Sequence, residues 1–138
     1  MAMTGSMDQQ TSKVGTSIRI LIVEDEALEA FLLKNCLNLE GYEVCELASS
    51  GQEAVDIAGR EQPDVIVMDH GLNGNMNGFD TAKEIRRFLD VPVLFLTGFI
   101  DDDFITQMKN FTPADGLMKP CRIPDVLAKI QELLNPPT

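Results

Sequence analysis

Polar residues that could carry out chemistry follow four separate apolar runs, the last of which is short. Residues 24–26 (Glu-Asp-Glu) follow the first run, and Asp69, Thr97 and Lys119 follow three later ones. In an open parallel sheet the carboxyl ends of the strands meet at one edge, and ligands bind there. If the four runs are parallel strands, these side chains should lie together although they are far apart in the chain.

The residue types in this set suit the transfer of a phosphoryl group to a carboxylate. Magnesium prefers oxygen ligands, and Glu24, Asp25 and Asp69 could supply them. An aspartate can attack a phosphoryl group when a metal ion and a fixed cation neutralise the phosphoryl oxygens, and Lys119 would be that cation. The Thr97 hydroxyl could donate to a further phosphoryl oxygen and so act as a switch. We therefore expect Asp69 to be the phosphoacceptor and Mg2+ to be the cofactor.

The length and composition indicate one compact α/β domain. The chain has 138 residues, of which 44% are hydrophobic, enough for a single core with little room for a second module. Residues 1–17 are polar and without periodicity, which predicts a flexible leader or an expression remnant. The folded domain is expected over residues 18–134, followed by a short tail at 135–138.

Charge and cysteine content exclude several classes of protein. Acidic residues number 22 against 11 basic ones, for a formal net charge of -11, which disfavours direct binding to nucleic acid or to anionic membranes. Cys36, Cys45 and Cys121 are odd in number and widely spaced, so neither a disulfide framework nor a zinc site is indicated. Because no apolar stretch approaches the roughly 20 residues of a membrane span, a cytoplasmic protein is expected.

Apolar patterning predicts strict alternation of strands and helices. This alternation implies right-handed crossovers and a doubly wound, five-stranded parallel sheet with five helices in the flavodoxin-like order 2-1-3-4-5. Strands are expected at 20–23, 42–47, 65–68, 93–96 and 117–118, and helices at 28–39, 50–58, 82–89, 101–111 and 123–134.

Several local features refine these elements. Ser50 and Glu53 match a capping box, Asp101 is placed to cap the fourth helix, and the mixed polarity of residues 42–47 suggests a sheet edge. Cys36 and Cys45 fall in patterns expected to face the core. The apolar residues of the first helix that recur at helical spacing are Leu28, Phe31, Leu32, Cys36 and Leu39.

Over residues 18–134 the chain resembles the receiver domain of two-component response regulators, the CheY-like family. The resemblance rests on Val-Glu-Asp-Glu at 23–26, Met-Asp at 68–69, Leu-Thr-Gly at 96–98 and Lys-Pro at 119–120. It implies that Glu24 and Asp25 are the metal pair with Asp69, and that the main-chain carbonyl of Gly71 completes the metal shell.

The resemblance also implies partners and a mode of action. The phosphodonor would be a sensor histidine kinase or a histidine phosphotransfer protein, and a downstream effector protein, or a second copy in a homodimer, would read the result. Such a domain is not an enzyme beyond assisting its own phosphorylation and dephosphorylation. Gly71 and Phe99, two residues after Asp69 and Thr97, occupy positions that in the family tune loss of the phosphoryl group.

Two departures from the family pattern stand out. The loop at 72–78 lacks the usual proline and is one residue longer. Gly116 stands where the family usually places an aromatic residue that turns inward with the switch hydroxyl. We therefore expect the output to be read differently from the usual surface of fourth helix, fifth strand and fifth helix.

Two other functions remain open from the residues alone. Residues 69–80 superficially match a calcium-binding loop, although Gly71 stands at its third position and Asp80 replaces the final glutamate. A magnesium-dependent phosphatase with an aspartyl-phosphate intermediate would use a similar set, yet it needs a second acid where Gly71 stands. A relay role for His70 is disfavoured, because neighbours on a strand face opposite ways.

Overall fold

A computed structural model describes residues 17–136, which form a five-stranded parallel sheet in the order β2-β1-β3-β4-β5. This order confirms the predicted flavodoxin-like α/β fold. The strands are β1 (Arg19–Val23), β2 (Glu43–Val44), β3 (Val65–Asp69), β4 (Val93–Thr97) and β5 (Ala114–Met118). The helices are α1 (Ala27–Leu39), α2 (Gly51–Glu61), α3 (Gly78–Arg86), α4 (Asp102–Met108), the short 3-10 helix η2 (Lys109–Phe111) and α5 (Ile123–Leu134).

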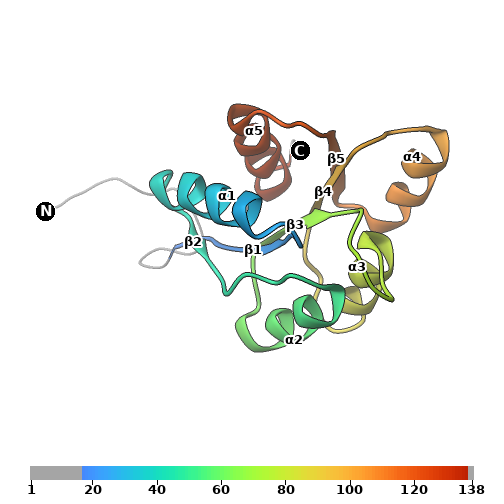
Figure 1. Cartoon of the computed structure of the whole chain (residues 1–138), viewed down its shortest axis with the longest axis horizontal. Coiled ribbons are helices and arrows are strands. Elements are labelled where there is room, and N and C mark those ends of the chain that lie inside the picture. The colour runs from blue at the N-terminus through green and yellow to red at the C-terminus, as the bar shows by residue number, and fades with distance from the viewer. Residues whose placement is uncertain (1–16, 137–138) are drawn as a thin grey trace, which may run out of the picture.

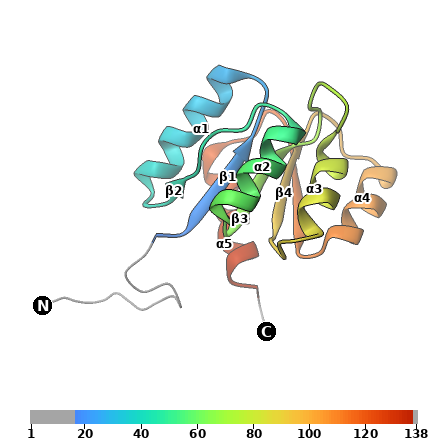
Figure 2. The same ribbon diagram turned by 90° about the horizontal axis from the view of Figure 1, so that it is seen from below.

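The sheet is covered on both faces (Figures 1 and 2). Helices α1 and α5 lie on one face, and α2, α3 and α4 lie on the other. Each face has its own apolar cluster, the first with Ile22, Val67 and Ile130 and the second with Met68, Phe79 and Phe95. Successive residues of a strand point to opposite faces, so strands buried on both sides read as continuous apolar runs.

The predicted core face of α1 is wrong, although the helix itself is confirmed. Four of the apolar residues at helical spacing are more than half exposed, and Cys36 is only partly buried, whereas Cys45 is buried as expected. The residues of α1 that are buried are Ala30 and Leu37. The helix is apolar around most of its circumference, so its periodicity did not define one face. The exposed side chains are Leu28 (69%), Phe31 (54%), Leu32 (53%) and Leu39 (87%).

Helix ends follow capping chemistry, with one expectation corrected. Ser50 does cap α2 by accepting from the amide of Glu53, but the carboxylate of Glu53 accepts from Ser49 and not from Ser50. The complete capping box lies at α3, between Asn77 and Asp80. Asp101 caps α4 as expected, accepting from the amide of Phe104 at 2.8 Å.

The outer strands differ in extent from the predicted ones. The edge strand β2 has only two residues, and the chain reaches the sheet again through a bridge between Val23 and Ala48. The other edge strand, β5, is longer than expected because backbone pairing continues through Asp115 and Gly116, which interrupt the apolar run. The predicted leader at 1–17 lies almost wholly outside the described residues, as does the end of the predicted tail.

Candidate functional site

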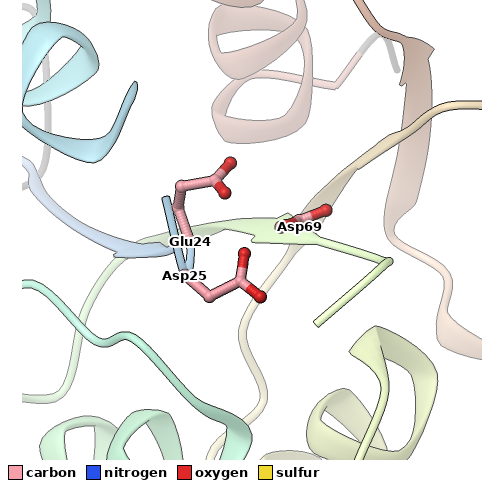
Figure 3. Close-up of side chains that lie close together, drawn as sticks. All are labelled: Glu24, Asp25 and Asp69. Carbon is pink, nitrogen blue, oxygen red and sulfur yellow. The ribbon is translucent and has the colours of Figure 1, made fainter. Parts of the chain in front are cut away.

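Three carboxylates meet where β1 and β3 end (Figure 3). Glu24 and Asp25 directly follow β1, and Asp69 is the last residue of β3. The register pairs Val23 with Met68, which brings the two strand ends level. One oxygen from each carboxylate lies within 4.8 Å of the others, with Glu24 and Asp69 buried and Asp25 partly buried.

Lys119 joins two of these acids. Its Nζ lies 3.2 Å from Oε1 of Glu24 and 3.2 Å from Oδ1 of Asp69. The backbone of Lys119 is fixed by a 2.7 Å hydrogen bond from its amide to the carbonyl of Thr97, so the ends of β4 and β5 set its position. Burial lowers the pKa of Lys119, but the hydrogen bonds and charges of Asp69 and Glu24 outweigh that effect and leave the pKa above its usual value.

Backbone amides hold each carboxylate in place. The amide of Glu26 donates to Glu24 at 3.1 Å, that of Gly71 donates to Asp69 at 3.0 Å, and that of Asn73 donates to Asp25 at 3.1 Å. Sequence reasoning missed these donors, because every residue except proline carries an amide and only the folded loop aims it.

The donor set fits a hard divalent cation. Burial, together with the charge of Asp69, raises the pKa of Glu24 from 4.5 to about 7, although an amide and Lys119 favour its ionised form. Lys119 pairs with two of the three clustered acids, and carboxylate oxygens are the ligands that Mg2+ takes. Gly71 is exposed, and its amide donates to Asp69. Its carbonyl therefore lies in the loop that directly follows Asp69.

Thr97 ends β4 on the same edge, but its hydroxyl makes no hydrogen bond to Asp69 among the described residues. It instead exchanges long hydrogen bonds with the backbone of Phe99, at 3.3 and 3.4 Å. Thr97 is buried, whereas the Phe99 side chain is 69% exposed. The structure therefore places all predicted site residues at one edge, with Thr97 turned toward its own loop.

Comparison with known proteins shows the family of this chain. Residues 20–131 match the response regulator receiver domain. The chain belongs to this family. Its similarity to the transcriptional regulatory protein PdtaR of Mycobacterium tuberculosis is 36% identity over 113 residues, covering 82% of this chain and 55% of that protein. The receiver domain thus spans about half the length of this curated relative.

Further similarities agree with this family. The osmosensing histidine protein kinase SLN1 of Saccharomyces cerevisiae is 36% identical over 124 residues, covering 85% of this chain and 10% of that protein. Among solved structures, the Vibrio cholerae chemotaxis protein CheY4 superposes with a TM-score of 0.78 at 28% identity, covering 86% of this chain and 100% of that one. The receiver fold is therefore shared with proteins of very different length.

The loop that follows Asp69 in this receiver domain closes tightly on α3. A Cβ atom at Gly78 would lie 2.8 Å from the Cα of His70 and 3.1 Å from the carbonyl oxygen of Asp69. Only glycine allows this approach, and the Gly78 amide donates to the His70 carbonyl at 3.1 Å. The start of α3 is thus held directly against the end of β3.

His70 faces away from the acids, as expected from strand alternation. Its ring packs against Phe79 and Phe104, with centroids 4.4 and 5.3 Å away. Desolvation lowers the pKa of His70 despite the nearby charges of Asp69 and Asp80. It is a member of the aromatic cluster on the α3 and α4 face and is no part of the carboxylate site.

The calcium-loop alternative is not supported in this receiver domain. Asp69 ends a strand rather than a helix, and the carboxylate of Asp80 accepts from the amide of Asn77 as part of the α3 capping box. The two ends of the sequence match therefore serve different structural roles.

A cleft of about 510 Å³ opens beside the site, between α1 and the start of α5. Glu24 and Lys119 lie at its polar end, and Leu32, Pro120 and Ile123 supply apolar walls. Cys121 also lines it, with its thiol 3.4 Å from the carbonyl of Met118.

No helix in the described part of the chain is long and apolar enough to cross a membrane.

Proposed function

We propose that this receiver domain accepts a phosphoryl group on Asp69 from a phosphohistidine donor and changes its interaction surface in response. The observation that carries this proposal is the asymmetric environment of the Asp69 carboxylate. Oδ1 is held by the Gly71 amide and by Lys119, whereas Oδ2 has no hydrogen-bond or ion-pair partner among the described residues. One oxygen is therefore fixed, and the other remains available as a nucleophile.

In the proposed reaction, Oδ2 attacks phosphorus while the bond from phosphorus to the donor's imidazole nitrogen breaks. The imidazole leaves with its electron pair and takes up a proton, and Asp69 becomes an acyl phosphate. Lys119 already lies against the carboxylate and supplies positive charge to the transferring oxygens.

We propose Mg2+ as the cofactor, held by Glu24, Asp25, Asp69 and the main-chain carbonyl of Gly71. When bound, the ion neutralises charge that develops on the phosphoryl oxygens. The chain's own contribution is to place these carboxylates, through the amides of Glu26, Gly71 and Asn73, before any ligand arrives.

Thr97 is proposed as the switch. Its hydroxyl makes only long hydrogen bonds to the backbone of Phe99, so little is lost when it rotates toward a phosphoryl oxygen. The carbonyl of Thr97 accepts from the amide of Lys119. The rotation of Thr97 would therefore occur next to the lysine that contacts the Asp69 carboxylate.

Gly71 and Phe99 are proposed to tune loss of the phosphoryl group. Gly71 presents no side chain to Asp69, which leaves room for water. The exposed ring of Phe99 stands at the end of β4 beside Thr97, where it could shield the group from water.

The partners and setting are part of the same proposal. A sensor histidine kinase or a histidine phosphotransfer protein would donate the phosphoryl group, reaching the site beside the cleft that ends at Glu24 and Lys119. A downstream effector, or a second copy of the chain, would read the changed surface. The folded unit would be residues 18–134, and the protein would be cytoplasmic. It would make no direct contacts with nucleic acid or membrane, and it would not turn over external substrates.

Intact-mass measurement tests the proposal. The chain is incubated with Mg2+ and acetyl phosphate, and the mass is expected to increase by one phosphate. Asp69→Asn should show no gain, whereas Asp56→Asn, a matched change on α2, should behave like the wild type. An equal gain in Asp69→Asn would refute the assignment. Sustained hydrolysis of small phosphate esters would favour the phosphatase alternative instead.

A further inference from the structure

The space beside Gly116 is filled by helix α4. A Cβ atom built at Gly116 would lie 3.3 Å from the sulfur of Met108 and 3.5 and 3.7 Å from ring atoms of Phe104. The pairing of Gly116 with Phe95 in the sheet places this contact directly over the β4–β5 pair. Even a Cβ atom at 116 would require Met108 to shift by a few tenths of an ångström, so the side chains of Met108 and Phe104 occupy the space that a larger residue at 116 would need.

Phe104 is the one buried residue of α4. Its ring centroid lies 5.3 Å from that of His70, 5.2 Å from that of Phe79 and 6.2 Å from that of Phe95. Since the rest of α4 is exposed or partly buried, the position of the helix depends largely on where this ring sits.

His70 is tied to the carboxylate next to it through the backbone. The Gly71 amide, which follows His70, donates to Oδ1 of Asp69. The His70 amide donates to Leu96 at 2.8 Å, and its carbonyl accepts from Gly78. Its Nδ1 atom is buried without a hydrogen-bond partner in the described part of the chain, so ring packing holds the imidazole. Phosphorylation of Oδ2 would turn Oδ1 from a charged carboxylate oxygen into a carbonyl oxygen and so would weaken the hydrogen bond from the His70–Gly71 peptide, which carries this ring.

We propose that the His70–Phe104 ring contact couples the state of Asp69 to α4, so that phosphorylation is read on the face formed by α3 and α4. The proposal rests on the proposed phosphorylation of Asp69. His70 and Phe104 act as positioning residues: they touch neither metal nor phosphoryl group, and they set where α4 lies. Coupling through His70 and Phe104 does not require an aromatic side chain at position 116, which is a glycine in this chain.

Backbone amide spectra of the full chain test the coupling. Nuclear magnetic resonance shifts are recorded with Mg2+, before and after beryllium trifluoride is added as a phosphoryl mimic. In the wild type, shifts in α3 and α4 should exceed those in β5 and α5 by about twofold or more. In Phe104→Leu, shifts in α4 should fall by about twofold or more, while those at residues 69–71 persist.

Matched variants separate the coupling from general loosening of the core. Phe111→Leu makes the same change in the same aromatic cluster, where Phe111 packs on Phe79 and Phe95 but has no ring contact with His70 among the described residues, so shifts in α4 should persist. His70→Leu should repeat the effect of Phe104→Leu and serves if that variant unfolds.

The outcomes distinguish this inference from the proposed function. Wild-type shifts centred on β5 and α5, undiminished α4 shifts in Phe104→Leu, or an equal loss in Phe111→Leu would each overturn the coupling while the mass gain on Asp69 persists. Absence of that mass gain in the wild type would instead overturn the phosphorylation of Asp69, and the coupling with it.

Discussion

Nζ of Lys119 lies 3.2 Å from Oδ1 of Asp69, and it lies equally close to Oε1 of Glu24. One ammonium group thus serves two carboxylates that come from different strands. Both acids are buried, and among the described residues Lys119 is the cation that forms ion pairs with them.

Replacing the shared cation should affect both reaction and stability. In Lys119→Ala, phosphorylation by acetyl phosphate should slow by about a hundredfold, since a fixed charge at the transferring group is lost. The free energy of unfolding of the metal-free protein should fall by roughly 1–2 kcal/mol, because two buried carboxylates lose their partner. Mass spectrometry and urea denaturation measure these effects. Lys129→Ala, which removes a 2.9 Å ion pair with Asp115 away from the site, should leave the phosphorylation rate unchanged.

Metal binding should depend on Asp25 and not on its neighbour. Asp25→Asn removes one charged ligand of the three-acid cluster, so Mg2+ affinity measured by calorimetry should fall about tenfold or more. Glu26→Gln changes an exposed carboxylate that is outside the cluster. Equal losses in the two variants would show that net charge, rather than coordination, controls the affinity.

Glu24 predicts a pH dependence of stability in the metal-free protein. Its folded-state pKa of about 7 lies above its ordinary value of 4.5, so between these values the folded chain holds a proton that the unfolded chain has released. Stability should therefore decrease as the pH rises through this window, by roughly 3 kcal/mol at most. Urea denaturation in the presence of a chelator, on either side of the window, should show this slope in the wild type and a smaller one in Glu24→Gln.

Phe99 should influence how long a phosphoryl group survives on Asp69. In Phe99→Ala the half-life of the phosphorylated protein should shorten by about twofold or more, since an apolar shield against water is removed. The decay is followed by intact mass after the donor is removed. Phe88→Ala also truncates a half-exposed ring, which follows the end of α3 and lies beside Gly59 of α2, and this variant should decay at the wild-type rate.

Arg86 should matter for stability alone. Its guanidinium donates to the carbonyls of Val91, Phe111 and Pro113 at 2.7, 2.6 and 3.1 Å. These bonds join the end of α3 to the segments that lead into β4 and β5. Arg86→Ala should lower the free energy of unfolding by about 2 kcal/mol, as measured by thermal or urea denaturation. Arg87→Ala, at the 74% exposed side chain next to it that pairs with Glu84, should change it by less than about 0.5 kcal/mol.

The fold was predicted correctly where a buried strand appears in the sequence as an unbroken run of apolar residues. Runs such as 65–68 and 93–96 are apolar throughout because helices cover both faces, and the polar residues that follow them mark the strand ends. At α1 the same reasoning failed, since Leu28 and Leu39 are as apolar as buried residues yet face outward. Hydrophobicity shows that a face could be buried, and only the neighbouring α5 and sheet decide which face is.

The sequence by itself determined the strand order and which side chains share an edge, because alternation, strand length and right-handed crossovers leave few arrangements. The tertiary structure alone decided which oxygens are held, through the amides of Gly71 and Asn73, and that Phe104 of α4 packs beside Gly116. The physical reason is that register and loop closure bring together atoms far apart in the chain. Such contacts leave no local pattern of residues to read.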